Sequence, residues 1–249
     1  MIRLLVILIV ILLFFLLSLP IYLILWLVGL GGHKERRDKM ALFFVRGIFR
    51  LILWIAGTKI TVMGKERLPE NQACLYVGNH SGFFDILTGY TRLPGRIGFV
   101  SKVEIKKVPF LNWWMYFVNC LFFDRKNMKD AVRMISDGTK KLKEGISIFI
   151  FPEGTRSKDG KVHEFKEGSL RMGVKAKTPI VPIAIHGTNR VFEDHFPWIR
   201  PAKVTMEIGT PLYPADFSKE DQKHMGAMAR EQIITMLEGQ GLEVRPKES

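Results

Sequence analysis

The stretch that decides the fold is residues 73–85, which read ACLYVGNHSGFFD. Residues Ala73–Val77 are apolar at successive positions, as in a strand buried on both faces of a sheet. A polar, glycine-containing turn follows directly and carries His80 and Asp85. In open α/β sheets, ligands and catalytic groups gather where the strands end. The stretch therefore predicts a central strand whose carboxyl end carries chemistry.

The same pattern recurs along the rest of the chain. After Gly57, short apolar runs alternate with amphipathic stretches and turn signals, which is typical of an α/β fold. We expect a central, mostly parallel but mixed sheet flanked by helices. One helix is expected after an N-cap at Asn127, and a last helix from about Ser218 to Gly239. The expected strands are Lys59–Met63, Ala73–Val77, Gly98–Val100, Leu121–Phe123, Ser147–Phe151, Ile180–Ile185 and Val204–Ile208.

The N-terminus has a different character. From Leu4 to Gly32 no residue is charged, and nearly all are Leu, Ile, Val or Phe. About 20 apolar residues suffice to cross a bilayer. The run is longer than the core of a secretory signal peptide, and no small-residue cleavage site follows it. We expect a retained, membrane-embedded helical element; Pro20 leaves open both a full span and a shallow hairpin in one leaflet.

A basic segment follows this apolar run. Residues 32–39 contain four Lys or Arg, and by the positive-inside rule they lie on the cytoplasmic side. We therefore expect the protein in the inner membrane, with the rest of the chain on its cytoplasmic face. The predicted organisation is a membrane-anchoring segment, residues 1–57, and a second domain, residues 58–249.

The end of the anchoring segment is amphipathic. Met40–Gly57 is apolar except for Arg46 and Arg50, which share one helical face with Arg36 and Lys39. This pattern predicts an interfacial helix with its cations at the headgroups. A core helix with a solvated basic stripe is the alternative.

Composition excludes several classes of protein. The chain has 249 residues, a formal charge of +13 and 47% hydrophobic residues, which excludes a disordered or collagen-like chain. Cys74 and Cys120 lie in apolar runs without metal-finger spacing, so we expect small core residues, with a Cys120 thiol nucleophile as the alternative. A basic chain binds nucleic acid, acidic proteins or anionic membranes. No basic stripe with interleaved aromatics indicates nucleic acid, and the N-terminus favours the membrane.

His80 and Asp85 form the first candidate for chemistry. Across a strand-to-helix turn, the carboxylate can accept the Nδ1–H of the imidazole and leave Nε2 for a substrate. Ser81 is adjacent and lacks the G-x-S-x-G surroundings of a nucleophile, so the activated hydroxyl belongs to the substrate. Taken alone, the pair also fits a non-catalytic arrangement, in which Asp85 caps the helix that follows and His80 has a structural role.

Cations follow three other expected strands. Residues 151–157, FPEGTRS, come after one strand; Gly154 permits close backbone approach, and Arg156 offers paired donors to a phosphate. Arg125 follows a second strand and Lys102 a third. Three cations at the same sheet edge as the His–Asp pair predict an anion-binding catalytic cleft, which favours the catalytic interpretation of the pair.

These stretches resemble the four sequence blocks of the glycerolipid acyltransferases. The likeness covers roughly Thr58 to Leu212 and is greatest to the bacterial 1-acyl-sn-glycerol-3-phosphate acyltransferases. It departs at Asn119, where the second block usually opens with Gly, and we expect this departure to affect the acceptor pocket. The matching blocks are Asn79-His80-x4-Asp85, Phe122-Phe123-Asp124-Arg125, Phe151-Pro152-Glu153-Gly154-Thr155-Arg156-Ser157 and Val181-Pro182-Ile183.

The resemblance implies transfer of a fatty acyl group to the sn-2 hydroxyl of lysophosphatidic acid, giving phosphatidic acid for phospholipid biosynthesis. The implied donor is a thioester of acyl carrier protein or coenzyme A. The implied partners are these substrates and the phospholipid membrane, with no nucleic acid, no metal and no other cofactor. Alternatives are acyl transfer to another lysophospholipid, glycerol 3-phosphate or an aminoacyl lipid, hydrolysis of the thioester by water, and a non-catalytic membrane scaffold.

Each site residue then has an expected role. His80 is the general base, and Asp85 fixes its tautomer. The acceptor phosphate is held by Lys102, Arg125 and Arg156. Glu153, Gly154 and Thr155 shape the pocket turn, and Glu153 and Gly154 place a backbone N–H toward the developing oxyanion. An apolar groove for an acyl chain, or else a buried helix face, is expected at Leu111, Trp113, Trp114, Met115 and Phe117.

Overall fold

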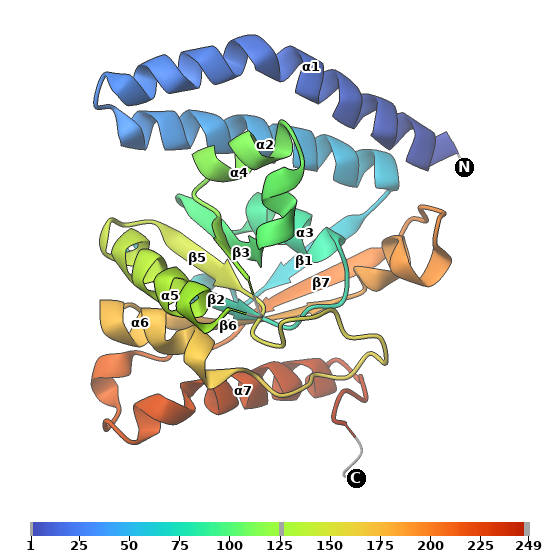
Figure 1. Cartoon of the computed structure of the whole chain (residues 1–249). Coiled ribbons are helices and arrows are strands. Elements are labelled where there is room, and N and C mark those ends of the chain that lie inside the picture. Colours follow the sequence, from blue (N-terminus) through green and yellow to red (C-terminus); the bar gives the residue numbers. More distant parts are fainter. Residues whose placement is uncertain (1, 125–126, 247–249) are drawn as a thin grey trace.

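The computed structural model describes residues 2–124 and 127–246. In this part of the chain, the strands are β1 (Lys59–Met63), β2 (Leu75–Gly78), β3 (Ile97–Lys102), β4 (Leu121–Phe123), β5 (Ser147–Ile150), β6 (Ile180–His186) and β7 (Lys203–Ile208). They form one seven-stranded sheet of order β1-β7-β6-β2-β5-β3-β4 (Figure 1). The strands from β6 to β4 are parallel, whereas β7 is antiparallel to β6 and parallel to β1. The predicted mixed, mostly parallel sheet is confirmed.

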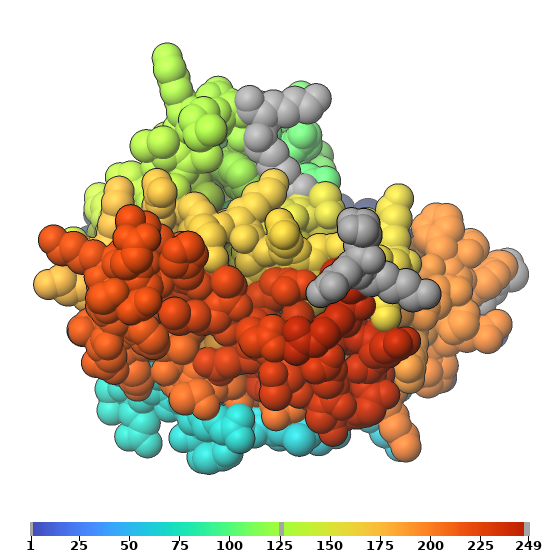
Figure 2. Space-filling model, turned by 90° about the horizontal axis from the view of Figure 1, so that it is seen from below, coloured from blue at the N-terminus to red at the C-terminus, as the bar shows by residue number. Residues whose placement is uncertain are grey.

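Helices cover both faces of the sheet (Figure 1). On one face lie α2 (Lys34–Ala56), α3 (Phe84–Arg92) and α4 (Leu111–Phe117), with α1 (Ile2–Leu30) outside them. On the other face lie α5 (Met128–Lys143), α6 (Arg171–Ala176) and α7 (Met225–Gly239). Figure 2 views the molecule from this second side, where α7 forms much of the surface.

The strand β2 divides the hydrophobic core into two layers. Successive side chains of a strand point to opposite faces, so Tyr76 packs toward α2 and α3, whereas Leu75 and Val77 pack toward α6 and α7. All three side chains are buried. Cys74 and Cys120 are also buried and free, as predicted for small core residues. Burial raises the pKa of the Cys120 thiol, which argues against a thiolate nucleophile there.

The helices α1 and α2 form an antiparallel pair above the sheet (Figure 1). By length and composition α1 can cross a membrane: it has 29 residues, its most apolar window has a mean hydropathy of 3.3, and 11% of that window is buried. The helix continues through Pro20, and the chain turns instead at Gly31 and Gly32. One side of α1 faces the protein, where Leu25 is fully buried.

Arg46 does not occupy the headgroup position expected for it. Its guanidinium donates to the carbonyls of Tyr90 at 2.8 Å, Leu93 at 2.7 Å and Gly95 at 3.0 Å. The last carbonyls of a helix have no partner within the helix, so a cation at the end of α3 satisfies them. Arg46 therefore joins α2 to α3, whereas Arg50 is exposed.

The groove expected along α4 is closed at two of its residues. The indole N–H of Trp114 donates to Ser18 Oγ of α1 at 2.9 Å, and the Trp114 ring stacks on Phe14 with centroids 5.0 Å apart. Trp114 and Phe117 are buried, whereas Trp113 is half exposed. The alternative of a buried helix face holds at Trp114 and Phe117, because α1 covers them.

Candidate functional site

His80 and Asp85 lie at the carboxyl end of β2. His80 is in the turn after the strand, and Asp85 is in the first turn of α3. The imidazole Nδ1 and the carboxylate Oδ2 are 2.7 Å apart. The imidazole also stacks on the ring of Phe151, with centroids 4.1 Å apart and planes inclined by 13°. The ring is therefore fixed in position, and Nε2 is the nitrogen left for a substrate.

The carboxylate of Asp85 is fully buried and held by several donors. The backbone N–H groups of Ser81 and Gly82 donate to Oδ2 at 2.7 and 2.8 Å. The hydroxyl of Thr188, in the segment after β6, donates to Oδ1 at 2.5 Å. Because donors stabilise a buried negative charge, this arrangement favours an ionised Asp85 that accepts a hydrogen bond from His80.

Glu153 fixes the backbone of His80 from the turn after β5. One carboxylate oxygen accepts the N–H of His80 at 3.0 Å, and the other accepts the N–H of His163 at 3.1 Å. Burial raises the pKa of the Glu153 carboxyl, against the lowering effect of the two donors. The N–H of Ser157 in turn donates to the carbonyl of His80 at 2.8 Å. The turn after β5 therefore positions the proposed base.

One backbone N–H of this turn already has an acceptor. Gly154 has a φ of +79°, a conformation that favours glycine, and Thr155 is exposed beside it. The N–H of Gly154, however, donates to the carbonyl of Phe151 at 3.0 Å. Because this N–H already has an acceptor, it is not free to stabilise an oxyanion in this arrangement.

Arg156 is held between an aromatic ring and a carboxylate. Its Nη1 lies 3.0 Å from Glu193 Oε1, and its Cζ lies 4.1 Å from the centroid of the Phe83 ring. The same oxygen of Glu193 accepts the N–H of Phe83 at 2.7 Å. A Cβ at Gly82 would lie 2.6 Å from Glu193 Oε2, so the close approach of this carboxylate requires glycine. The guanidinium is therefore placed beside the turn that carries His80.

Another of the predicted cations, Lys102, belongs to the far side of β5. Lys102 ends β3 and is exposed; its register partner is Phe123, the last residue of β4. Arg125 lies outside the described residues. The structure thus places Arg156 on the side of the segment that follows β6, where it pairs with Glu193. Lys102 lies on the other side, at the end of β3, which is separated from β2 by β5. The two described cations therefore lie on different sides of β5.

Asn119 lies at the opposite end of the strands from His80. It precedes β4 and has a φ of +63°, which explains why glycine suits this position. Its amide donates to Asp38 Oδ2 at 2.9 Å and accepts from Lys141 Nζ at 2.8 Å. The residue at this position therefore provides a polar link between α2 and α5, and its effect on the acceptor pocket stays a prediction.

A family model described as Acyltransferase matches residues 59–186, which include every strand that carries a described site residue. The chain belongs to the acyltransferase family.

Curated relatives and a solved structure agree with this assignment. A 1-acyl-sn-glycerol-3-phosphate acyltransferase of Borreliella burgdorferi is 28% identical over 200 residues, covering 80% of each chain. One of Cocos nucifera is 31% identical over 176 residues, covering 70% of this chain but 56% of the longer plant protein. The crystal structure of the 1-acyl-sn-glycerophosphate acyltransferase of Thermotoga maritima has a TM-score of 0.73 and 26% identity, covering 93% of this chain and 99% of that one.

Three polar residues of this acyltransferase site carry no predicted role. Thr188 and Glu193 follow β6, and nothing near them in the sequence marks them except their place after a buried strand. Asn79 lies in the first block; its amide pairs with both the carbonyl and the N–H of Ile185, at 2.8 Å each. It therefore joins the end of β2 to β6, the strand that leads to Thr188.

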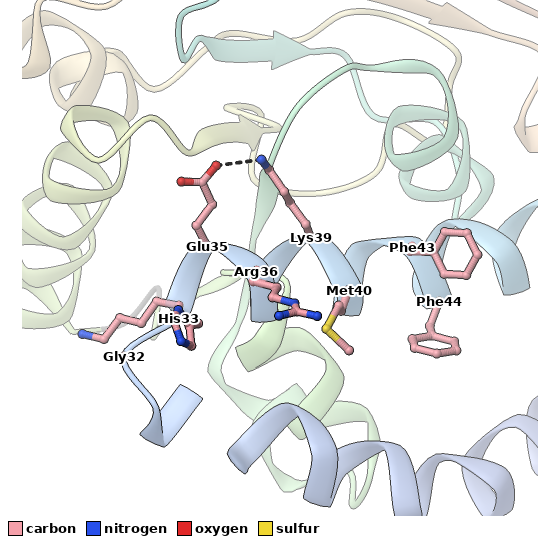
Figure 3. A pocket seen from close by; sticks show the side chains of 9 residues that line it. Gly32, His33, Glu35, Arg36, Lys39, Met40, Phe43 and Phe44 are labelled. Atoms are coloured by element: carbon pink, nitrogen blue, oxygen red, sulfur yellow. Dashed lines mark ion pairs between the residues drawn. The ribbon is translucent and has the colours of Figure 1, made fainter. Parts of the chain in front are cut away.

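The acyltransferase has a separate hollow at the start of α2, lined by residues from Gly32 to Phe44. This hollow, of about 870 Å³, contains none of the site residues described above. In Figure 3, Arg36, Met40 and Phe44 point toward α1, whereas Glu35 and Lys39 point away and form an ion pair of 2.8 Å. The wall combines cations with apolar side chains at the end of the apolar helix. Within the described residues, no group of three His, Cys, Asp or Glu is placed to hold a metal.

Proposed function

We propose that this acyltransferase transfers a fatty acyl group from a thioester to the sn-2 hydroxyl of lysophosphatidic acid, giving phosphatidic acid. The observation that carries the proposal is the 2.7 Å contact between His80 and the fully buried Asp85 at the end of β2. Relatives that act on 1-acylglycerol phosphates support the same acceptor.

The proposed reaction needs a base and no acyl-enzyme. Nε2 of His80 takes the proton of the acceptor hydroxyl while the oxygen attacks the thioester carbonyl. Asp85 holds Nδ1–H and stabilises the imidazolium that forms. As the C–O bond forms, the C–S bond breaks, and the proton passes from His80 to the departing thiolate. No metal or other cofactor takes part, because the thioester is already activated.

The cations of the site hold the phosphate of the acceptor in this proposal. Arg156 is fixed beside His80 by Phe83 and Glu193, with donors of its guanidinium left for an anion. Lys102, at the end of β3, and Arg125, which follows Asp124 in the sequence, complete the set in this proposal. The position of Lys102, two strands along from β2, favours its contact to a different phosphate oxygen or to the acyl donor.

We also propose that the enzyme works at the cytoplasmic face of the inner membrane. The apolar α1 anchors it, and the cations around the hollow at Gly32–Phe44 lie at the anionic headgroups. A site held at headgroup depth takes up a lysolipid without moving its chain through water. The partners are thus the phospholipid membrane, lysophosphatidic acid and an acyl thioester of acyl carrier protein or coenzyme A.

The test uses the purified, detergent-solubilised protein with labelled acyl thioester and lysophosphatidic acid. Phosphatidic acid and free fatty acid are measured separately, with acyl carrier protein and coenzyme A thioesters compared as donors. We expect His80→Ala to lower phosphatidic acid formation about a hundred- to ten-thousand-fold, the usual contribution of a general base. His224→Ala, at an exposed position before α7, is the control.

The products distinguish the alternatives. Free fatty acid without acceptor-dependent product would show a thioesterase and overturn the proposal. Phosphatidic acid formed at a near-normal rate by His80→Ala would remove His80 as the base. Product only with another lysophospholipid or with glycerol 3-phosphate would change the acceptor.

A further inference from the structure

The segment after β6 exposes aromatic side chains in a folded loop. Phe196 is 73% exposed and Trp198 is 40% exposed. The loop is held by backbone bonds, among them Trp198 N–H to the carbonyl of His195 at 2.7 Å and Arg200 N–H to the carbonyl of Val191 at 2.9 Å. The two aromatic side chains are therefore displayed by a fixed backbone. We call residues 192–198 the aromatic lip.

A row of rings connects the lip to the site. The ring of Phe83, half exposed beside the His80 turn, has its centroid 6.3 Å from that of Phe192. Phe192 and Phe196 follow with centroids 5.4 Å apart. At the inner end, the guanidinium of Arg156 lies over Phe83. An apolar path thus runs from the tip of the lip to the cation proposed to hold the acceptor phosphate.

The lip also lies on the same side of the molecule as the start of α1. In Figure 1 the loop between β6 and β7 is beneath the N-terminal end of α1. A Cβ at Gly57, after α2, would lie 2.6 Å from Arg3 Nη1 and 3.1 Å from Pro201 Cβ, so α1 and the end of the loop meet there. Ile2 and Trp54, 79% and 78% exposed, extend the apolar surface at this end.

The composition of the lip suits the boundary between water and lipid. Tryptophan concentrates at membrane interfaces, where its ring is part apolar and part polar, and exposed phenylalanine gains by leaving water. Arg190 and Arg200 flank the lip as exposed cations that anionic headgroups attract. Asp194 is the exposed acid of the lip, and it accepts hydrogen bonds from the amide of Asn189.

We propose that the aromatic lip inserts into the bilayer interface beside α1 and forms the edge over which the lysolipid passes from the leaflet to His80. The occupant of this surface is the lipid bilayer, because the lip continues the apolar surface of α1. The inference rests on the proposed function for its acceptor, whereas insertion itself is measurable without activity.

The first experiment measures depth on the full-length protein in vesicles of phosphatidylcholine and phosphatidylglycerol. A nitroxide is attached at Phe196→Cys or, as a control, at Val132→Cys, a 61% exposed position on α5. The native cysteines are both buried, which directs labelling to the new thiol. We expect collisions with oxygen to exceed those with a water-soluble nickel chelate at position 196, and the reverse at position 132. A label as accessible to nickel at 196 as at 132 overturns the proposal.

The second experiment separates membrane access from chemistry. We expect the double variant Phe196→Ser, Trp198→Ser to raise KM for long-chain lysophosphatidic acid in vesicles about tenfold, with kcat within about twofold. KM for a short-chain acceptor dissolved in water stays unchanged, because it needs no passage from the leaflet. Tyr213→Ser is the control, since Tyr213 is also 40% exposed but lies outside the lip. An unchanged vesicle KM, or an equal loss with both acceptors, overturns the proposed path.

Failure of the inference and failure of the proposed function give different results. A wild-type enzyme that makes phosphatidic acid while the label at 196 lies in water refutes insertion alone. A label buried in lipid on a protein that makes no phosphatidic acid refutes the proposed function and leaves insertion standing.

Discussion

At the scale of single residues, Asp85 accepts hydrogen bonds from four groups. They are Nδ1 of His80, the N–H groups of Ser81 and Gly82, and the hydroxyl of Thr188. A buried carboxylate without such donors would be strongly disfavoured in its charged form. The set of donors therefore offsets the cost of burying the carboxylate and fixes the direction in which it holds the imidazole.

Thr188 tests this arrangement without changing the pair itself. Thr188→Val removes the hydroxyl that donates to Oδ1, so that only Oδ2 of Asp85 is still held by donors. We expect kcat/KM for lysophosphatidic acid to fall about tenfold, because a hydrogen bond to a charged group contributes about 1.5–3 kcal/mol. The measurement is the steady-state rate of phosphatidic acid formation.

Thr188→Ser keeps the hydroxyl and is the matched control, with a kcat/KM expected to stay near that of the wild type. A wild-type kcat/KM in Thr188→Val would show that this hydroxyl does not act on the pair.

Glu193 is expected to act through Arg156 rather than on the reacting atoms. Glu193→Gln keeps an acceptor for the Phe83 N–H but removes the charge that holds the guanidinium. We expect KM for lysophosphatidic acid to rise about three- to fivefold with kcat and the donor KM unchanged, because the pair is partly exposed and screened. Steady-state kinetics with each substrate varied in turn measure this.

Asp194→Asn provides the control, since it neutralises the neighbouring exposed carboxylate. A fall in kcat with unchanged acceptor KM in Glu193→Gln would contradict the positioning role.

At the scale of elements, the strands were the most predictable part of the fold. The bounds of β1 and β4 agree with those expected, because charged residues and turns mark both ends. The expected Gly98–Val100 is the middle of β3, which extends to Ser101 and Lys102 where it pairs with β4 at the edge of the sheet. A polar strand end at a sheet edge has no hydrophobic signature, so the pattern understated its length.

Helix ends were less predictable. Asn127 caps α5 as expected and accepts N–H groups of Lys129 and Asp130. The last helix was expected from about Ser218, but α7 begins at Met225 after a 3₁₀ turn, Asp221–His224. Ser218 accepts the N–H of Asp221 and so mimics a helix cap locally. A cap signal alone does not distinguish a 3₁₀ turn from the start of an α-helix.

The site was predictable where motifs brought its residues together and not elsewhere. His80, Asp85 and the turn at Glu153 belong to blocks with fixed spacing. Thr188 and Glu193 reach the site only because β6 lies beside β2, and strand order is not written in any local pattern. The prediction for Arg46 was wrong because the pattern of a helical face shows which cations lie together, but it does not show which backbone carbonyls they contact.

The contact of α2 with α3 gives a prediction at this scale. Arg46→Met leaves the carbonyls of Tyr90, Leu93 and Gly95 without their donor, and unsatisfied groups of this kind cost about 1–3 kcal/mol. We expect a lower thermal midpoint in detergent. Arg50→Met, one turn along the same helix and exposed, is expected to stay near the wild type.

An equal loss of stability in both variants would assign the effect to charge on α2 rather than to the bonds of Arg46.

At the scale of the whole molecule, the apolar helix is also part of the protein's packing. Buried residues of α1 and α2 belong to the same hydrophobic cluster as the sheet face that α2, α3 and α4 cover. Leu25 and Tyr76 are among the members of this cluster. The predicted membrane-anchoring segment and the domain that carries the site thus share a core. In the proposed arrangement, α1 both holds the enzyme at lipid and covers its interior.

Removal of residues 1–33 tests this dual role. Without α1, the indole of Trp114 loses Ser18 and Phe14, and the apolar inner face of α2 meets water. We expect the shortened chain to aggregate in detergent-free buffer, measured by size-exclusion chromatography with light scattering. A monomeric shortened chain that forms phosphatidic acid from a water-soluble acceptor would show that α1 serves as an anchor alone.

The placement of Thr188 has a consequence for how the protein is made. Synthesis runs from the N-terminus, so α1 leaves the ribosome before any residue of the site. Asp85 acquires its hydroxyl donor only after β6 has emerged more than a hundred residues later, and β1 finds its neighbour only with β7. With α1 as the proposed anchor, the nascent chain offers its hydrophobic segment to the membrane while its catalytic centre is still incomplete, and the centre is assembled where the proposed lipid substrate resides.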